Sequence, residues 1–323
     1  MRVLVTGGGG FIGHHLVRTL LEQGDEVSVI DDFSTGRRDR LQPYEGAIRL
    51  IEGDIRDASA LDLAIEGCSV VLHEAALPSV ARSVRDPRLS NEVSTSGSIE
   101  VMLAAHRAGV GRVVLAGSSS IYGDTPGLPR RETQGASPMS PYATSKLAAE
   151  FYVHTLGQLH GIETVVLRYF NVFGPGQDPA SEYAAVVPRF VTAALAGAQP
   201  VVYGDGLQSR DFTYIENVVS ANLLAARVPG VSKLTCNIGC GERYSLLDLL
   251  DAIGRSVGRQ LTPRFEPARR GDVAHSQADI SLASSSLGYR VRVPFAEGVR
   301  RTVMAYKESA DTVETPGADR DRV

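Results

Sequence analysis

The sequence predicts an α/β protein built on a doubly wound parallel sheet, with a smaller mixed lobe toward the carboxyl terminus. Two observations support this fold class. Short apolar runs rich in β-branched residues alternate with helical patterns through the first half of the chain, which is typical of parallel strands buried on both faces. The first run leads directly into a glycine-rich turn, T-G-G-G-G-F-I-G at 6–13, where a helix then begins.

Six strands and four helices are expected in the first 170 residues. The strands are the apolar runs at 2–6, 26–31, 47–52, 69–73, 112–116 and 163–168. The helices are segments with apolar residues at helical spacing, at 11–23, 57–66, 86–108 and 140–160. In the second lobe we expect a short apolar run at 234–238 and helices at 184–197, 216–227 and 245–257.

The composition is that of an ordinary globular protein. Hydrophobic residues make up 43% of the 323, and the net charge of −4 gives no argument for a nucleic-acid or lipid partner. Cys68, Cys236 and Cys240 are too few and too scattered for a disulfide framework or a zinc site. No apolar run reaches the ~18 residues of a membrane span, and Met1 leads directly into the first strand. We therefore expect a cytoplasmic protein that binds no metal, membrane or nucleic acid.

The glycine turn is the first candidate binding site. Gly7, Gly10 and Gly13 fall at G-x-x-G-x-x-G spacing between a strand and a helix, and Asp31 ends the second strand. Glycines permit a tight turn and close approach of the backbone to a pyrophosphate, whose charge is attracted by the free N–H groups of the helix N-terminus. The pattern predicts a dinucleotide site of the Rossmann type.

Asp31 favours NAD over NADP as the dinucleotide. A carboxylate at this position can accept hydrogen bonds from the adenosine ribose and repels a 2′-phosphate. Arg37 and Arg38 are the contrary sign, because their charges could neutralise such a phosphate. Asp54 and Ile55 follow the third strand and are expected near the adenine, with helix capping as an equally open role for the acids at 54 and 57.

The candidate catalytic segment is S-P-Y-A-T-S-K at 140–146. Ser140 is a suitable N-cap and Pro141 a suitable first helical residue, so Tyr142 and Lys146 are expected one turn apart on one helix face. An ammonium lowers the pKa of a nearby phenol, and the positive charge of a bound oxidised nicotinamide lowers it further. Tyr142 is therefore predicted to act as a base near neutral pH. The alternative is a surface lysine beside a half-buried tyrosine.

A second polar segment, A-G-S-S-S-I-Y-G at 116–123, ends a strand in three hydroxyls. These hydroxyls are expected at the edge of the sheet where doubly wound folds bind their ligands. Ser118 is predicted to hydrogen-bond the same substrate oxygen as Tyr142. Capping of a turn is the alternative role for the serines.

A series of ordered motifs runs through about residues 1–305: T-G-G-G-G-F-I-G, V-I-D-D-F-S-T-G, G-D-I-R-D, L-H-E-A-A, S-S-S-I-Y-G, S-P-Y-A-T-S-K, L-R-Y-F-N-V-F-G-P, R-D-F-T-Y-I and R-R-G-D-V. This series resembles the extended short-chain dehydrogenases/reductases of the nucleotide-sugar epimerase/dehydratase group. The resemblance implies that Ser118, Tyr142 and Lys146 are catalytic. It also implies NAD as the cofactor, bound by Gly7, Gly10, Phe11, Ile12, Gly13, Asp31, Asp32, Ser34, Thr35, Gly36, Asp54, Ile55, Ala75, Ala76, Asn91, Tyr142, Lys146 and Tyr169.

The domain assignment combines this resemblance with the change of pattern after residue 170. Residues 1–170 form the expected NAD-binding Rossmann domain, to which segments around 208–240 return. Residues 171–207 and 241–307 form the expected nucleotide-sugar-binding lobe. Residues 308–323 carry almost no apolar surface to offset the entropy of ordering, so they are predicted to be a disordered tail.

The residues after Ser118 distinguish the reactions within the group. Dehydratases of the group carry an acidic pair there and decarboxylases keep one glutamate, whereas this chain has Ser119 and Ser120, which leaves elimination without an acid or base. Uronate 4-epimerases place a threonine and an arginine where this chain has Asn171 and Asp178, and an aspartate repels a sugar carboxylate. The resemblance therefore favours 4-epimerisation of a neutral UDP-hexose through a transient 4-keto intermediate.

The resemblance also supplies the substrate residues, which are Ser119, Ser120, Asn171, Val186, Tyr203, Arg210, Arg269, Asp272 and Ser276. Arg210 and Arg269 are placed on the diphosphate, where a guanidinium can donate two hydrogen bonds. Pairing with Asp211 or Asp272 is their alternative role, and Asp272 is placed on ribose hydroxyls. Ser276 stands where members that accept N-acetylhexosamines have a small residue. UDP-GlcNAc/UDP-GalNAc is the favoured substrate pair, with UDP-Glc/UDP-Gal as a possible second activity.

Other functions stay open as alternatives. They are a dTDP-sugar epimerase, ketoreductase or dehydratase, a UDP-uronate epimerase, and, from a different class, a non-catalytic dinucleotide sensor. Such sensors tend to lose the tyrosine or the lysine, and both are present here. In many relatives the helices expected at 86–108 and 140–160 form a dimer interface, which implies a homodimer. Core packing is the alternative role for the apolar stripe of Leu147, Phe151 and Leu156.

Overall fold

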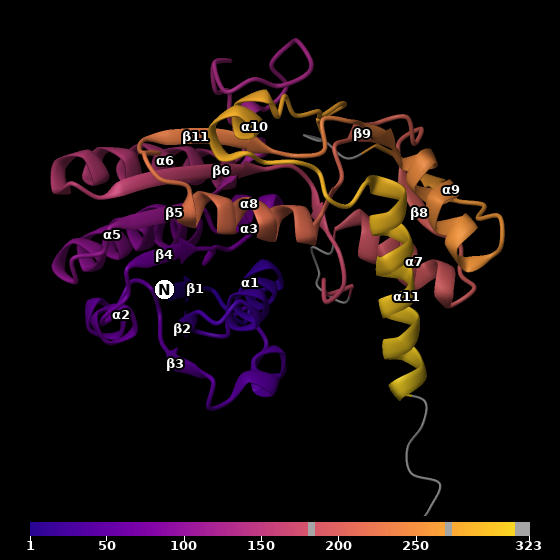
Figure 1. Cartoon of the computed structure of the whole chain (residues 1–323). Coiled ribbons are helices and arrows are strands. Elements are labelled where there is room, and N and C mark those ends of the chain that lie inside the picture. The colour runs from indigo at the N-terminus through magenta and orange to yellow at the C-terminus, as the bar shows by residue number, and fades with distance from the viewer. Residues whose placement is uncertain (180–184, 269–272, 314–323) are drawn as a thin grey trace, which may run out of the picture.

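The computed structural model describes residues 1–179, 185–268 and 273–313 of the chain. A seven-stranded parallel sheet forms its centre, in the order β3-β2-β1-β4-β5-β6-β11 (Figure 1). Its strands are β1 (Arg2–Thr6), β2 (Glu26–Asp31), β3 (Ile48–Glu52), β4 (Val70–His73), β5 (Arg112–Ser118), β6 (Glu163–Tyr169) and β11 (Leu234–Ile238). The chain order reverses between β1 and β4, which confirms the predicted doubly wound α/β fold.

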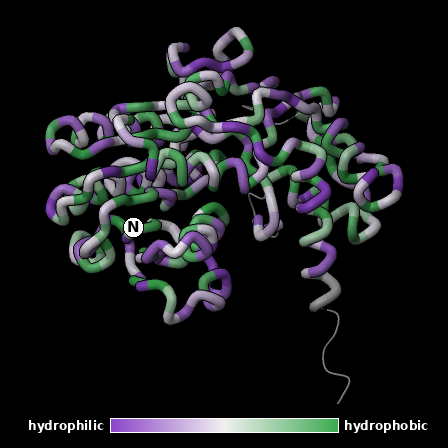
Figure 2. The backbone as a smooth tube through the Cα atoms, viewed as in Figure 1, coloured by the Kyte–Doolittle hydropathy of each residue, from purple (hydrophilic) through white to green (hydrophobic). Residues whose placement is uncertain are grey.

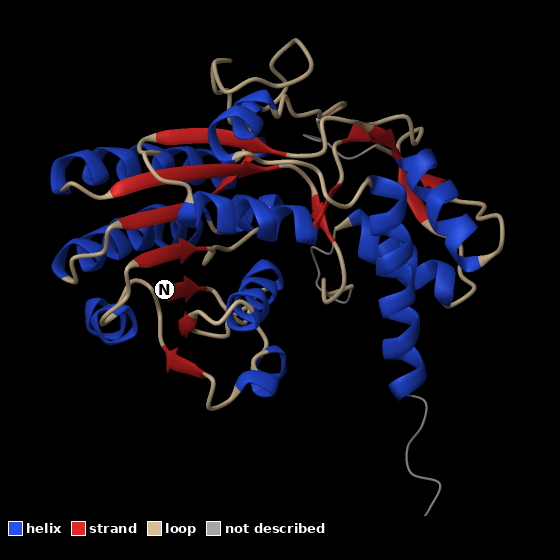
Figure 3. Cartoon of the chain, in the orientation of Figure 1, coloured by secondary structure: helices blue, strands red, loops and turns tan. Residues whose placement is uncertain are grey.

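Helices cover both faces of this sheet (Figure 3). One face carries α1 (Phe11–Glu22) and α8 (Ile215–Arg227), and the other carries α2 (Ala58–Ile65), α5 (Gly97–Arg107) and α6 (Pro141–His160). The single helix expected at 86–108 is divided, because α4 (Pro87–Asn91) reaches α5 through a π-helical turn at Glu92–Ser96. A short helix, α3 (Val80–Arg85), precedes it.

The core follows from the alternation of apolar side chains along the buried strands. On β1, Val3 and Val5 pack in the cluster beneath α1 and α8, whereas Leu4 packs in the cluster beneath α2 and α5. Successive side chains of a strand point to opposite faces, so a continuous apolar run fills both layers. Figure 2 shows hydrophobic residues concentrated along the strands and the inward sides of the helices.

The second lobe packs three two-stranded sheets against helices. The strand pairs are β7 (Val172–Phe173) with β10 (Thr213–Tyr214), β8 (Val201–Tyr203) with β13 (Arg264–Glu266), and β9 (Ser209–Arg210) with β12 (Tyr244–Ser245). The helices are α7 (Val186–Leu195), α9 (Leu246–Val257), α10 (Ser281–Leu287) and α11 (Phe295–Val313). Short 3₁₀ turns lie at Arg38–Arg40, Gln42–Tyr44 and Ser119–Tyr122. None of the helices, over the residues described, has the length and apolarity needed to cross a membrane.

Two expectations need correction. The sheet has a seventh strand, because β11 pairs with β6 from Leu234 to Ile238. The predicted tail from residue 308 begins too early, since α11 continues to Val313, and 314–323 lie outside the described residues. The tail prediction considered only the apolar content of residues 308–323. Helix α11 begins before them and is held in place by the buried residues Val299 and Val303, so it continues past residue 308.

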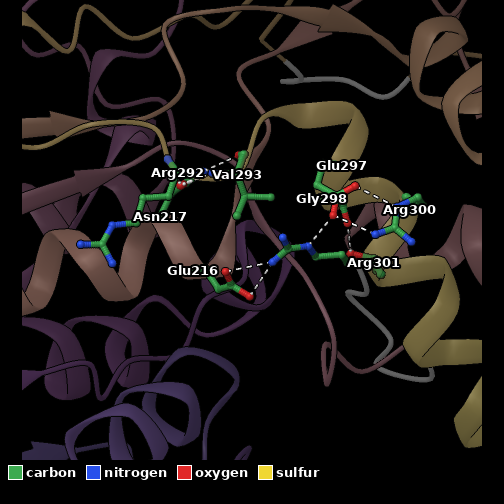
Figure 4. A network of polar contacts seen from close by, with 9 residues as sticks. Glu216, Asn217, Arg292, Val293, Glu297, Gly298, Arg300 and Arg301 are labelled. Atoms are coloured by element: carbon green, nitrogen blue, oxygen red, sulfur yellow. Dashed lines mark hydrogen bonds and ion pairs between the residues drawn. The ribbon is translucent and has the colours of Figure 1, made fainter. Parts of the chain in front are cut away.

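Polar contacts join α8 to the start of α11 (Figure 4). The Asn217 amide oxygen accepts from the backbone N–H groups of Arg292 (2.8 Å) and Val293 (3.0 Å), and its amide nitrogen donates to the Val293 carbonyl (2.8 Å). On the surface, Arg301 of α11 bonds Glu216 of α8 (3.1 Å). Because Asn217 is fully buried, these bonds hold the second lobe against the sheet domain.

A buried ion pair joins α6 to β6. Arg168 Nη2 lies 2.8 Å from Glu150 Oε2, with the two side chains 11% and 4% exposed. Arg168 Nη1 also donates to the Tyr122 hydroxyl (2.9 Å), which donates to Asn237 Oδ1 (2.7 Å) on β11. One polar network therefore links α6, β6, β11 and the turn after β5.

We predict that Glu150→Gln lowers the free energy of unfolding by about 3–5 kcal/mol, because it leaves the Arg168 guanidinium buried without its partner charge. Urea denaturation followed by circular dichroism measures the change. The matched control is Asp62→Asn, which breaks the exposed pair with Arg107 and is expected to cost less than ~1 kcal/mol. Equal losses in the two variants would contradict the prediction.

Candidate active site

A cavity of about 1080 Å³ lies at the carboxyl ends of the central strands and extends to the second lobe. Ligands bind at this edge in doubly wound folds. Nearly all of the predicted cofactor residues line it, namely Gly7, Gly10, Phe11, Ile12, Gly13, Asp31, Asp32, Ser34, Thr35, Gly36, Asp54, Ile55, Ala75, Ala76, Tyr142, Lys146 and Tyr169. The structure thus brings together residues that are up to 162 positions apart in the sequence, from Gly7 to Tyr169.

The glycine turn has the shape that a pyrophosphate requires. Gly10 is the N-cap of α1 and makes no side-chain capping bond, so the helix N-terminus faces the cavity with free N–H groups. A Cβ on Gly13 would lie 2.1 Å from the Gly7 carbonyl oxygen, and Gly7 has a φ of +71°. Side chains at Gly7 and Gly13 would therefore clash with nearby backbone atoms. The glycine turn and the free N–H groups of α1 fit the pyrophosphate of a dinucleotide.

Asp31 lies beside this turn at the end of β2. Its carboxylate accepts from the backbone N–H groups of Gly9 (2.8 Å) and Phe33 (2.8 Å). Burial nevertheless raises the pKa of Asp31 above its ordinary value, with these two bonds lowering it. A Cβ on Gly36 would lie 2.7 Å from the same carboxylate. Gly9 and Gly36 therefore both pack directly against the Asp31 side chain.

The two arginines that could neutralise a 2′-phosphate are paired with acids. Arg37 forms an ion pair with Asp39, and Arg38 forms one with Glu52. Arg38 also stacks over the Phe33 ring, 4.3 Å from its centroid. Because both charges are already balanced, the charge pattern near Asp31 favours NAD over NADP.

Two further predicted acids bond within their own loops. The Asp32 carboxylate accepts from the Ser34 N–H (2.9 Å) and hydroxyl (2.7 Å). Asp54 pairs with Arg56 (2.5 Å). Of the two acids considered for helix capping, Asp57 caps α2 and Asp54 does not.

Asn91 was predicted to bind the cofactor, but the structure does not bring it to the cavity with the other predicted residues. Asn91 is exposed at the end of α4. Leu89 and Val93, four positions apart, line the cavity instead.

The start of α6 places Tyr142 and Lys146 at the cavity. The Ser140 hydroxyl caps the helix by accepting from the Ala143 N–H, and Pro141 occupies the first turn, as predicted. Lys146 is 4% exposed, and its Nζ donates to the Ala116 carbonyl of β5 (2.9 Å). Burial lowers the pKa of Lys146 to about 8, with Glu74 and Glu150 opposing the shift, so the ammonium is still charged at neutral pH.

Ser118, at the end of β5, lies close enough to the Tyr142 phenol to lower its pKa. Burial raises the pKa of Tyr142 above its ordinary value and is the larger of the two effects. The predicted downward shift relied on Lys146 together with a positively charged nicotinamide ring. The groups of the chain give an upward shift instead, and Lys146 is not among those that act on Tyr142.

The capping role considered for the serines is observed at Ser118. The Ser118 hydroxyl accepts from the Ser120 N–H (3.2 Å), which caps the 3₁₀ turn, and lies 2.8 Å from the Ser120 hydroxyl. Ser118, Ser119 and Ser120 all line the cavity. The cap fixes the hydroxyl of Ser118 at the position from which it reaches Tyr142.

The predicted substrate residues divide into three sets. Asn171, Arg210 and Ser276 line the main cavity together with the serines. Val186 and Tyr203 line an adjoining cavity of about 260 Å³ that Asn171 and Arg210 also border. Arg269 and Asp272 lie outside the described residues.

Several cavity residues were not anticipated from the sequence, among them Glu74, Arg82, Arg130 and His275. The position of Glu74 could have been predicted, because it is a charged residue directly after a buried strand in L-H-E-A-A. Arg130 carried none, because its guanidinium donates to the Gly127 carbonyl (3.2 Å) and shapes a loop that only the fold brings to the cavity.

Comparison with known proteins gives consistent matches. Residues 3–239 match the NAD dependent epimerase/dehydratase family. The UDP-glucose 4-epimerase of Mycolicibacterium smegmatis is 38% identical over 314 residues, which cover 96% of this chain and 100% of that protein. The structure of the UDP-glucose 4-epimerase of Thermotoga maritima with UDP-glucose matches at a TM-score of 0.91 and 33% identity, covering 96% of this chain and 100% of that one. The structure of the UDP-N-acetylglucosamine 4-epimerase of Methanobrevibacter ruminantium M1, in complex with UDP-N-acetylmuramic acid, matches at a TM-score of 0.90 and 35% identity. The match covers 95% of this chain and 98% of that one.

Proposed function

This chain belongs to the NAD-dependent epimerase/dehydratase family, and we propose that it is a 4-epimerase of UDP-hexoses. NAD is its cofactor. One observation carries the proposal: Tyr142, Lys146 and Ser118 meet at a cavity that also contains the glycine turn. The named activities of the relatives from M. smegmatis, T. maritima and M. ruminantium support the same reaction.

In the proposed mechanism the chain moves one proton at the sugar C4 oxygen. NAD, which the glycine turn and Asp31 would hold, would supply a reversible hydride acceptor for the sugar C4. Tyr142 takes the hydroxyl proton on oxidation and gives it back on reduction. Lys146, charged at neutral pH, would stabilise the phenolate that is present before oxidation and again after reduction. Ser118 lies beside Tyr142 and would orient the reacting oxygen.

The serines beside Ser118 support epimerisation rather than dehydration. Ser119 and Ser120 line the cavity, and hydroxyls at these positions do not provide the acid and base that elimination needs. Ketoreduction would require exchangeable cofactor, whereas epimerisation regenerates NAD in each cycle. The proposed reaction is therefore redox-neutral.

We further propose UDP-GlcNAc/UDP-GalNAc as the favoured substrate pair, with UDP-Glc/UDP-Gal as a second one. Asp178 borders the cavity, and its charge disfavours a uronate substrate. Its field also acts on Arg37 and Arg40 at the cofactor side. Ser276 borders the cavity with a small side chain, which leaves room for an acetamido group.

Part of the α6 surface supports the proposed homodimer. Phe151 and Leu159 of α6 are 66% and 71% exposed, and Val84 of the neighbouring α3 is 64% exposed. Leu147 and Leu156, by contrast, pack against buried clusters, so the alternative core role applies to these two. Exposed apolar groups of this size mark contact surfaces. Analytical ultracentrifugation is expected to give twice the 34.5 kDa mass of one chain; a monomer at micromolar concentration would contradict the proposal.

Incubation with UDP-GlcNAc, and separately with UDP-Glc, tests the reaction. No cofactor is added, and proton NMR follows the anomeric and H4 signals. We expect the C4 epimer to form without a net change in nicotinamide absorbance. Tyr142→Phe is expected to reduce turnover by at least ~100-fold, the scale of general base catalysis, while bound NAD is retained. The control Tyr152→Phe changes a half-exposed tyrosine on the same helix and should keep full activity; full activity in Tyr142→Phe would end the assignment.

Ser276→Tyr tests the sugar preference. The larger side chain is expected to lower kcat/KM for UDP-GlcNAc by more than ~10-fold relative to UDP-Glc, because it fills the space proposed for the acetamido group. Ser276→Ala keeps this space open and serves as the control. An equal effect of Ser276→Tyr on both substrates would place the acetamido group elsewhere.

A further inference from the structure

Arg40 links the two lobes beside the glycine turn. It ends the 3₁₀ turn at Arg38–Arg40, after β2, and lines the cofactor cavity. Its Nη1 donates to the Gly9 carbonyl (3.0 Å), and its Nη2 donates to the Gly176 carbonyl (2.5 Å). Gly9 belongs to the glycine turn, whereas Gly176 follows β7 and lies 136 positions further along the chain than Arg40. A single guanidinium therefore bridges the sheet domain and the second lobe at the cavity.

Two other elements hold the same segment, residues 174–178. His15 of α1 is 5% exposed, and its Nε2 lies 2.9 Å from the Pro175 carbonyl oxygen. Because a carbonyl can only accept, Nε2 carries the hydrogen of this bond. The Tyr306 hydroxyl of α11 donates to the Gln177 carbonyl. The turn after β2, α1 and α11 therefore meet on one short segment.

This segment forms part of the cavity wall. Gln177 and Asp178 line the cavity directly. Gly176 has a φ of +81°, and a Cβ there would lie 3.1 Å from the His14 ring, so the chain needs glycine to present this carbonyl to Arg40. The bridge sets how closely the segment approaches the glycine turn. It therefore also sets how far the cavity is open at its pyrophosphate end.

The charge of Arg40 is suited to an anion in the cavity. Arg37 and Arg38 of the same loop form ion pairs with acids, whereas Arg40 has no acid at ion-pair distance in the part of the chain that the structure describes. Asp39 and Asp178 act on its charge from further away. The N–H groups that the two carbonyls leave unused can donate to phosphate oxygens. A pyrophosphate at the glycine turn would thus be attracted by Arg40 and covered by its bridge.

We propose that Arg40 is a cofactor-retaining residue: its bridge between Gly9 and Gly176 closes the pyrophosphate end of the cavity, so that NAD leaves only when the bridge opens. Arg40 acts on the cofactor and not on the sugar, so this role is independent of which hexose reacts. It suits a redox-neutral reaction, because the same NAD is used in every cycle and turnover does not require its release.

Release of radiolabelled NAD tests the bridge without any turnover. The full chain is loaded with the label, free NAD is removed by gel filtration, excess unlabelled NAD is added, and the bound label is counted over time on filters. Arg40→Met keeps the length of the side chain but loses its charge and its N–H donors. We expect this variant to release NAD at least ~10-fold faster than the wild type, the scale of one lost hydrogen bond from a charged donor. Release at the wild-type rate would overturn the proposal.

Two controls separate the bridge from the charge. Arg49→Met removes an exposed arginine of β3 that pairs with Glu66 and does not line the cavity, and it should leave release unchanged. Arg40→Lys keeps the positive charge, but an ammonium lacks the fork with which a guanidinium holds both carbonyls, so release should still be faster than in the wild type. Wild-type retention in Arg40→Lys, or equal acceleration in Arg49→Met and Arg40→Met, would show that charge alone is responsible and would overturn the bridge.

Tyr306→Phe carries the test if Arg40→Met fails to fold. It removes the hydroxyl that bonds the Gln177 carbonyl from α11 and leaves Arg40 in place. The segment is then held by fewer bonds, so release should be faster. Thermal unfolding of the NAD-free protein is measured beside it. Release at the wild-type rate, with or without a fall in the unfolding temperature, would show that these contacts only stabilise the fold and would overturn the proposal.

The epimerase proposal is tested apart from this one, because release of the label needs no sugar. Fast release from Arg40→Met, together with no epimerisation by the wild type, would reject the epimerase proposal alone. Epimerisation by the wild type, together with unchanged release from Arg40→Met, would reject the cofactor-retaining role alone.

Discussion

The burial of a lysine ammonium and a tyrosine phenol, one turn apart at the start of α6, is the constraint on which the rest of the active site depends. Burial works against the charge of Lys146 and against the ionisation of Tyr142. The surrounding elements offset this cost, because β5 supplies the Ala116 carbonyl and Ser118, and Glu74 and Glu150 raise the pKa of the lysine. The site therefore depends on segments whose relative positions are set by the parallel sheet.

The same sheet separates the positive and negative charges of the cofactor site. The helix N-terminus at Gly10 offers free N–H groups to a pyrophosphate. Asp31 supplies a negative charge at the end of β2, and Arg37 and Arg38 form ion pairs with Asp39 and Glu52. This arrangement favours a dinucleotide whose adenosine ribose carries no phosphate.

The second lobe depends on backbone contacts made by one buried acid. The Asp211 carboxylate accepts from the N–H groups of Cys240 (2.7 Å), Gly241 (3.0 Å) and Ala278 (3.1 Å). These bonds fix the segment that carries Ser276 beside β9. Ser276 is therefore held next to the strand that carries Arg210, and a substitution that moves one of these two residues is expected to move the other.

The linear chain by itself determined the doubly wound sheet, the glycine turn with Asp31, and the helix start that sets Tyr142 one turn from Lys146. These features rest on spacing within one or two elements, where apolar periodicity and capping act locally. Only the tertiary structure decided which strand β11 pairs with, that α11 continues to Val313, that Asn91 does not line the cavity, and that Glu74 accepts a hydrogen bond from Tyr169. The physical reason is that charge balance in a buried site depends on which groups packing brings together, and packing joins elements that are far apart along the chain.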